Sequence, residues 1–277
     1  SYPPDDAFMV RRLREAGAIV LGKSNMAEWA FSPYFTISST AGTTLNPYDL
    51  TRVPAGSSGG TAAAVAANLA AIGMGTDTGN SIRGPASHTA LVGIRSTLGS
   101  TSRDGIVPLL SNRDVAGPLT RSVEDAARVF NIIAGFDPAD PLTRKAMKQL
   151  PSDYTQFLRK DGLQDVHLGV LRALSNTETE DPEILALFEQ AILDLRRLGA
   201  IVVDPVEIKD FAKQRAANDF CSAFLWDVNK YFQSLGPKAP VVSFMQIIRS
   251  GQYHPSSKWG IDWVNSTKIP PEQQNPP

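Results

Sequence analysis

The segment GSSGGTAAAVAANLAAIGMGTDTGNSIRGP, residues 56–85, places a helix, a strand and two glycine-rich clusters in close succession. The alanine-rich run 59–67 predicts a helix of small side chains, which can lie very close to its neighbours. Residues 69–74 predict a short buried strand that glycines interrupt. The clusters at 56–60 and 75–85 lie beside these elements, where backbone N–H groups can converge on a ligand.

Regular elements before and after this segment alternate between helix and strand. Asp5 and Asp6 can cap a helix that ends at Gly17. Ser122 and Asp125 form a capping-box pattern at the start of a second helix. Residues 18–21, 167–171 and 201–203 are short apolar runs that predict buried strands.

A third helix is predicted in the second half of the chain. Asp181 is its N-cap, Pro182 takes the first helical position, and Gly199 ends it. Its apolar face carries Leu185, Phe188, Ile192 and Leu195. Strands that alternate with helices indicate an α/β class with a largely parallel sheet.

The composition gives no sign of a polyelectrolyte partner. The 277 residues include 27 basic and 28 acidic side chains without a long run of either sign, which argues against nucleic acid and against an anionic membrane. Cys221 is the single cysteine, and the histidines at 88, 167 and 254 fall in no metal-ligand spacing, so no metal is expected. No apolar run reaches the about 20 residues of a membrane span, and no signal peptide opens the chain, so a cytoplasmic protein is predicted. Because the chain begins at Ser1 without an initiator Met, we expect a fragment or a processed product.

Three familiar interpretations of glycine loops do not fit. No Lys-Ser or Lys-Thr pair follows Gly60, as a P-loop requires, and the glycine spacing in 73–79 does not match a dinucleotide fingerprint. Residues 56–60 do match a Gly-x-Ser-x-Gly nucleophile elbow with Ser58 at its centre. An elbow follows a strand, whereas residues 51–55 predict a turn, so Ser58 is disfavoured as a nucleophile.

The two clusters, together with GKSNMAEW at 22–29 and GPLTRSVED at 117–125, resemble the amidase signature family. The resemblance is dense over residues 5–135 and looser beyond them. It implies an α/β amidase signature fold with a central mixed β-sheet flanked by helices on both faces.

The resemblance assigns the chemistry to the two clusters. Ser81 matches the nucleophile, and Ser57, after a cis Gly56–Ser57 peptide bond, matches the serine that relays the nucleophile's proton to a lysine. Ser81 would form an acyl-enzyme that water hydrolyses, with no cofactor and no metal. The lysine belongs to a motif that this chain lacks, because Lys23 matches a different lysine of the family and the next one is Lys145.

The loop around the nucleophile supplies the other expected site residues. Successive backbone amides can hold the oxyanion of a tetrahedral intermediate, and we expect them from Thr78, Gly79, Asn80 and Ser81. Supporting roles are expected for Asp77, Arg83 and Ser58, with a surface position as the alternative for Arg83. Asn80 stands where many family members have glycine, so its side chain is expected to narrow the site.

The implied function is hydrolysis of a small-molecule carboxamide to a carboxylic acid and ammonia or an amine. Two alternatives stay open. One is the amidotransferase subunit that acts on tRNA-bound glutamate, ranked lower because the near-neutral charge offers no RNA surface. The other is a non-catalytic, amidase-like binding protein. Aromatic residues over 210–265 could line an acyl pocket, although core packing is their commoner use.

The resemblance also implies a domain organisation. Residues 1–277 would be a single domain truncated at both ends. In it, 1–135 form the signature core with the catalytic serines and 136–277 form the substrate-pocket half. Because truncation would expose apolar faces, we expect the chain alone to be marginally stable or to self-associate, and a homo-oligomer is left open.

Overall fold

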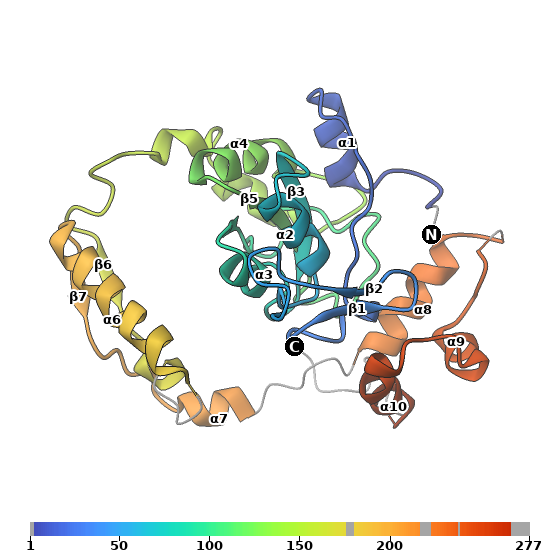
Figure 1. The fold of residues 1–277 in the computed structure, drawn as a ribbon. Helices are drawn as coiled ribbons and strands as arrows, with labels where there is room; N and C mark the ends of the chain where they lie inside the picture. The colour runs from blue at the N-terminus through green and yellow to red at the C-terminus, as the bar shows by residue number, and fades with distance from the viewer. Residues whose placement is uncertain (1–2, 176–179, 217–222, 238, 267–277) are drawn as a thin grey trace. The chain divides into compact units, whose positions relative to one another are not determined.

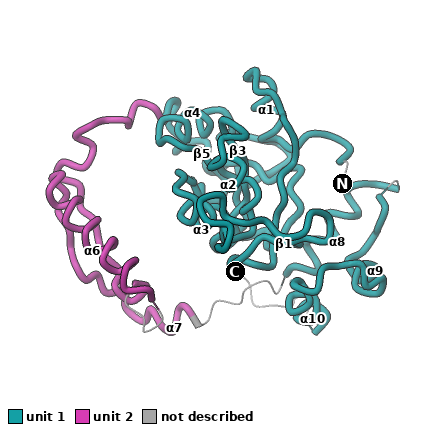
Figure 2. Tube along the Cα trace, viewed as in Figure 1, with its two compact units in different colours: residues 1–154, 221–277 teal, residues 155–220 magenta. Residues whose placement is uncertain are grey.

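The structure, a computed structural model, describes residues 3–175, 180–216, 223–237 and 239–266 (Figure 1). The chain divides into two compact units (Figure 2). The first contains residues 1–154 and 221–277, and the second contains residues 155–220. Cys221 lies outside the described residues, and the single-domain organisation stays a prediction. Among the residues described, no helix combines the length and apolar character needed to cross a membrane.

A three-stranded antiparallel sheet organises the first unit. Its order is β3 (Ile72–Asp77), β5 (Val115–Thr120) and β4 (Val92–Gly93), with β5 in the centre. Opposite residues in β3 and β5 run from the pair Ile72 and Thr120 to the pair Asp77 and Val115. Every residue of β5 is buried, as expected of a central strand.

Helices cover both faces of this sheet, because neighbouring residues of a strand point to opposite sides. Ala116 of β5 packs with Val129 and Phe130 of α4 (Val123–Ile133) and with α1 (Phe8–Glu15). Leu119 packs on the other side with α2 (Gly59–Ala66) and α3 (Arg83–His88). The predicted arrangement of helices on both faces of the sheet is thus confirmed.

A hairpin and a group of C-terminal helices complete the first unit. The hairpin pairs β1 (Thr36–Ser38) with β2 (Gly42–Thr44). The helices pack Phe224, Phe232 and Phe244 against Phe31 in one buried cluster. The C-terminal α-helices are α8 (Phe224–Ser234), α9 (Phe244–Ser250) and α10 (Lys258–Ser266). The short helix α5 (Thr143–Ala146) follows α4. The 3-10 helices are η1 (Glu28–Ala30), η2 (Met147–Gln149), η5 (Pro255–Ser257) and η3 (Tyr154–Phe157), which lies where the two units join along the chain.

The second unit contains one parallel strand pair and two α-helices. β6 (His167–Gly169) pairs with β7 (Ile201–Val203), and the helices are α6 (Pro182–Arg197) and α7 (Phe211–Ala216). A 3-10 helix, η4 (Arg172–Leu174), follows β6. The predicted start of α6 is confirmed: the Asp181 side chain accepts a hydrogen bond from the Glu183 N–H at 2.9 Å. Gly199 ends the helix with a left-handed backbone, φ +94°.

Three predictions about elements are wrong. Residues 18–21 form no β-ladder with any described segment, and the side chains of Ile19 and Leu21 are 85% and 73% exposed. The sequence predicts a largely parallel sheet, but the three-stranded sheet is antiparallel. The sequence pattern misses its central strand, β5, because a glycine and a proline in β5 weaken the strand signal. The N-cap of α1 is Ala7 without a side-chain cap, and Asp6 instead forms an ion pair with Arg14 at 2.7 Å.

Candidate active site

The two glycine-rich clusters lie against each other through a backbone contact. The Ser58 N–H, at the start of α2, donates to the Ser81 carbonyl at 3.2 Å. The Ser57 carbonyl in turn accepts the Ala27 N–H at 2.9 Å. Ser57 and Ser81 are both buried, and the Gly56–Ser57 peptide bond is cis, as the resemblance implies. The structure therefore brings the two expected catalytic serines into one small region.

The hydroxyl of Ser57 is fully buried and has no hydrogen-bond partner among the described residues. A buried hydroxyl normally finds a partner, because leaving it unpaired costs free energy. The atom is a donor and an acceptor at once, so it can pass a proton between two neighbours. Since Ser57 Oγ has no partner among the described residues, no described lysine donates to it.

Ser58 has a different environment. Its Oγ accepts the N–H of Thr76 and donates to the Thr76 carbonyl, both at 3.2 Å, and so joins the start of α2 to β3. A side chain on Gly75 would place its Cβ 2.8 Å from this oxygen, so glycine is required there. Within the described residues 45–57, no strand leads into Ser58, which agrees with the rejection of a nucleophile elbow. The Ser58 hydroxyl is thus committed to holding two elements together.

The first cluster also needs glycine to pack. A Cβ on Gly56 would lie 2.5 Å from the Ser32 carbonyl oxygen, and a Cβ on Gly60 would lie 2.7 Å from the Asn25 nitrogen. Both approaches are closer than real Cβ atoms show. The glycines therefore let the segments around Asn25 and Ser32 come within backbone contact of the loop that carries Ser57.

The four amides proposed for the oxyanion hole have no acceptor within the described part of the protein. None of the N–H groups of residues 78–81 donates a hydrogen bond to another described residue. The next amide, that of Ile82, donates to the buried carboxylate of Asp77 at 3.1 Å. The turn thus leaves consecutive N–H groups available beside Ser81, which is the requirement for binding an oxyanion.

Two guanidinium groups hold the Asp77 carboxylate. Arg83 donates through Nε at 3.2 Å, as expected for a bracing residue, and its Nη2 donates to the Gly79 carbonyl at 2.7 Å. Arg95 donates through Nη1 at 3.0 Å and is the less exposed of the two. Sequence reasoning misses Arg95, because it lies after the loop and outside both clusters.

The side chain of Asn80 is part of the loop's support. Its Nδ2 donates to the Pro33 carbonyl at 3.3 Å, and the same carbonyl accepts the Gly56 N–H at 3.1 Å. The Asn80 side chain also lies within 3 Å of where a Cβ on Gly84 would stand. Asn80 therefore links the nucleophile loop to the segment that also contacts Gly56.

The second residue that sequence reasoning misses is Asp114, which is 5% exposed. Its carboxylate accepts the N–H groups of Leu109 and Leu110, each at 2.8 Å, and the hydroxyl of Thr78. Burial raises the pKa of Asp114 and outweighs these hydrogen bonds, which lower it. A lone aspartate before a strand gives no signal for such a contact.

The aromatic residues of 210–265 mostly form core. Trp29 meets Phe244 edge to face with ring centroids 4.8 Å apart, and Phe224 meets Phe244 in the same way. Trp226 and Trp259 are the exposed exceptions, and Phe220 lies outside the described residues. Core packing is therefore the observed use of the buried aromatics.

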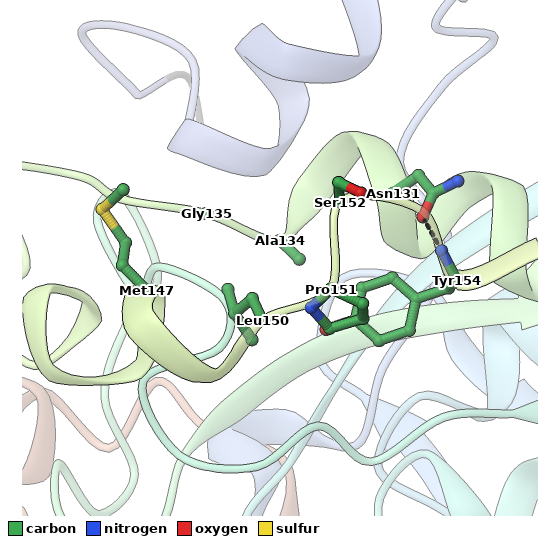
Figure 3. Close-up of a pocket in the computed structure, with 8 residues that line it drawn as sticks. All are labelled: Asn131, Ala134, Gly135, Met147, Leu150, Pro151, Ser152 and Tyr154. Atoms are coloured by element: carbon green, nitrogen blue, oxygen red, sulfur yellow. Dashed lines mark hydrogen bonds between the residues drawn. The ribbon is translucent and has the colours of Figure 1, made fainter. Parts of the chain in front are cut away.

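The first unit also contains a cavity of about 170 Å³ (Figure 3). It is formed by Asn131, Ala134, Gly135, Met147, Leu150, Pro151, Ser152 and Tyr154. The Tyr154 N–H donates to the side-chain oxygen of Asn131 at 2.7 Å, which links two of the lining residues. None of the lining residues belongs to either cluster, so the cavity contributes nothing to the candidate site.

Comparisons with known proteins give a family and several relatives. The family model described as Amidase matches residues 1–264. A probable amidase of Arabidopsis thaliana is 37% identical over 254 residues, which are 88% of this chain and 48% of that protein. A glutamyl-tRNA(Gln) amidotransferase subunit of Symbiobacterium thermophilum is 47% identical over 199 residues, 72% of this chain and 40% of that protein.

Solved structures give the same picture. The native peptide amidase of Stenotrophomonas maltophilia superimposes with a TM-score of 0.84 at 38% identity, over 99% of this chain and 57% of the other. An amidase family protein of Bacillus anthracis gives the same TM-score at 35% identity, over 97% of this chain and 54% of the other. The chain thus spans about half the length of the relatives that it matches.

Proposed function

We propose, since the chain belongs to the amidase family, that it carries the nucleophile half of an amidohydrolase site that cleaves a small-molecule carboxamide. Ser81 is the nucleophile, Ser57 is the proton relay, and the amides of residues 78–81 form the oxyanion hole. One observation carries the proposal. The buried Ser57 hydroxyl has no partner among the described residues, while its loop is bonded to the backbone of Ser81.

The reaction follows from these positions. Ser57 Oγ takes the proton of Ser81 Oγ and passes its own to a lysine outside this chain, while Ser81 Oγ attacks the amide carbonyl. The free N–H groups of 78–81 bind the oxyanion of the tetrahedral intermediate. Collapse breaks the C–N bond, and the amine or ammonia leaves with the relayed proton. Water then attacks the ester on Ser81, and the acid is released with Ser81 reprotonated.

The supporting residues keep this arrangement in place. The Asp77 carboxylate accepts hydrogen bonds from Arg83, Arg95 and the Ile82 N–H. These three bonds hold the turn after Ser81 in place. Ser58 fixes the start of α2 to β3. Neither carboxylate nor guanidinium needs to take part in proton transfer in this scheme. No cofactor is required, and a cytoplasmic location stays a prediction.

The test is a serine-directed fluorophosphonate probe with peptide mapping of the adduct. It is applied to this chain and to a protein extended at both ends to the length of the relatives. We expect an adduct on Ser81 of the extended protein. Ser81→Ala should lower kcat/KM for a cleaved amide by about four to six powers of ten. Ser57→Ala should lower it by about two to four powers of ten, as loss of proton transfer does.

Ser58→Ala is the matched control, because it removes a neighbouring hydroxyl that is bonded to Thr76. It should lower the melting temperature and leave the Ser81 adduct in place. An adduct on Ser58, or turnover that survives Ser81→Ala, would contradict the proposal and restore the elbow interpretation.

A second candidate function is that of an amidotransferase component. The observation that favours it is the 47% identity to a protein of glutamyl-tRNA(Gln) amidotransferase. The net charge of −1 argues against a tRNA surface on this chain. If the extended protein hydrolyses glutamine and tRNA stimulates this hydrolysis, the amidotransferase is favoured. If it hydrolyses small carboxamides and tRNA has no effect, the amidohydrolase is favoured. A third candidate, a non-catalytic binding protein, predicts partner affinity that Ser81→Ala leaves unchanged.

A further inference from the structure

The strand ladder beside the candidate site ends next to a position where only side chains can join the two strands. The antiparallel register pairs Asp77 with Val115 as its last members. The next opposite pair in this register is Thr78 and Asp114. This is a non-hydrogen-bonded position of the antiparallel ladder: Pro118, opposite Met74, has no N–H, and hydrogen-bonded pairs alternate with the others, so Asp77 with Val115 is the last hydrogen-bonded pair. The Asp114 N–H points away from β3 and donates to the Leu110 carbonyl at 2.9 Å, and the Thr78 N–H donates to no described residue.

Side chains join the two strands at this position, as opposite residues of a non-hydrogen-bonded pair lie close together. The Thr78 hydroxyl donates to the Asp114 carboxylate, which is buried and also accepts the Leu109 and Leu110 N–H groups at 2.8 Å. The contact therefore holds Thr78 beside β5 after the last hydrogen-bonded pair. The Thr78 amide points away from β5 at this position, and the amides of 79–81 follow it into the turn.

The neighbouring residue of the same turn makes a second attachment. The Arg113 carbonyl accepts Nη2 of Arg95 at 3.1 Å, and Nη1 of Arg95 donates to the Asp77 carboxylate at 3.0 Å. Arg113 is thus linked to Asp77 through the Arg95 guanidinium, and Asp114 is bonded directly to Thr78. The Ser111 N–H is itself fixed, by the Asp227 carboxylate of α8 at 3.0 Å.

We infer that Asp114 and the Thr78 side chain are positioning residues of the oxyanion hole, a role that rests on the proposed function. The Asp114–Thr78 contact fixes the chain at the point where it leaves the β3–β5 ladder and aims the amides of 78–81 at the developing oxyanion. Removing the contact displaces those amides and slows acylation of Ser81, while the serines themselves are untouched. A displacement of about 1 Å at such a site costs on the order of a hundredfold in rate.

The structure offers a matched control for a buried hydroxyl–carboxylate pair. Ser102 Oγ donates to the Asp137 carboxylate at 2.5 Å, and both residues are buried. The carboxylate of Asp137 also accepts a backbone N–H, from Ala139 at 3.0 Å. This pair has the same chemistry but contacts no residue of the nucleophile loop.

The experiment measures the second-order rate of fluorophosphonate labelling at Ser81 in the protein extended at both ends. Labelling forms an Oγ–P bond, releases fluoride and passes the serine proton to the relay, with the phosphoryl oxygen in the oxyanion position. Thr78→Val should slow labelling by about tenfold to a hundredfold, with every molecule still labelled at completion. Thr78→Ser, which keeps the hydroxyl, should restore the rate, and Asp114→Asn should fall between them.

Ser102→Ala should lower the melting temperature about as much as Thr78→Val and leave the labelling rate unchanged. Labelling of Thr78→Val at the unaltered rate would overturn the inference and leave the proposed function standing. Equal slowing in Ser102→Ala would also overturn it, since the effect would then follow stability. Absence of any Ser81 adduct in the unsubstituted extended protein would overturn the proposed function and the inference with it.

Discussion

Gly60 lies so close to Asn25 that an alanine in its place should destabilise the protein, although helix propensity alone predicts the opposite. Gly60 is the second residue of α2, where alanine would ordinarily be favoured by up to about 1 kcal/mol. Gly60→Ala should nevertheless destabilise the protein. Its Cβ would overlap the Asn25 carbonyl oxygen and lie 2.7 Å and 2.8 Å from the Asn25 nitrogen and carbonyl carbon.

The magnitude depends on whether Asn25 can move. Its side chain donates to the Gly42 carbonyl and to Thr44 Oγ1, both at 3.0 Å, and accepts from Ser38 at 2.7 Å. These bonds fix Asn25 to the β1–β2 hairpin, so the strain cannot be relieved cheaply. Overpacking costs about 1–3 kcal/mol, and because Asn25 is held in place we expect the upper part of that range, about 2–3 kcal/mol. The helix gain offsets about 1 kcal/mol of it, which leaves a net loss of about 1–2 kcal/mol.

The assay is thermal unfolding of the purified chain followed by circular dichroism. At about 2–4 °C per kcal/mol, Gly60→Ala should lower the melting temperature by about 2–8 °C. Gly22→Ala is the matched control, because a Cβ on Gly22 meets nothing within 4 Å, and its melting temperature should hardly change. A Gly60→Ala variant at least as stable as the parent would refute the packing argument, since helix propensity would then have won.

Three further predictions concern charge and exposed surface. Burial raises the pKa of Asp140, but hydrogen bonds from Arg103 outweigh it and hold the pKa below its ordinary 3.8. The ion pair therefore contributes its full stabilisation of the folded state above pH 3.8. The difference in melting temperature between the parent and Asp140→Asn should shrink as the pH falls below this value, because the carboxylate is then protonated. A constant difference would contradict this. Arg95→Met should cost about 1–3 kcal/mol in urea unfolding and more than Arg83→Met, because Arg95 is the less exposed partner of a buried carboxylate. An equal or reversed order would count against it. The exposed apolar segment around Ile19 should make the chain self-associate in sedimentation velocity, and Ile19→Lys should reduce that association. A concentration-independent monomer would show the expectation to be wrong.

Local signals predict the elements of this chain well where capping or glycine chemistry is explicit. Ser122 accepts the Asp125 N–H at 3.0 Å, as its capping pattern indicates, and α4 follows. The run 59–67 is a helix as predicted, and the strand predicted at 69–74 is observed at 72–77. In each case the interaction that fixes the element lies within a few residues of it.

The errors arise where the deciding partner is distant in sequence. The segment around Ile19 has a strand pattern but no described partner strand, and hydrogen bonds to a neighbour are what make a strand. β5 has a poor pattern, yet it occupies the centre of the sheet because β3 and β4 pair with it on both sides. Tertiary pairing therefore overrides strand propensity at both places.

The candidate site shows the same division between local and distant information. Ser57, Ser81 and Asp77 belong to clusters whose order can be recognised in the sequence. Arg95 and Asp114 do not, because their importance comes from the register that sets Asp77 opposite Val115. Side chains in a strand alternate with a period of two, so a slip of one residue would turn Asp114 to the other face and away from Thr78. The glycines of the clusters bring the serines together, and the antiparallel register determines which amides beside Ser81 stay free. The sequence of the loop thus identifies the reacting groups, whereas the sheet determines whether an oxyanion hole can form around them.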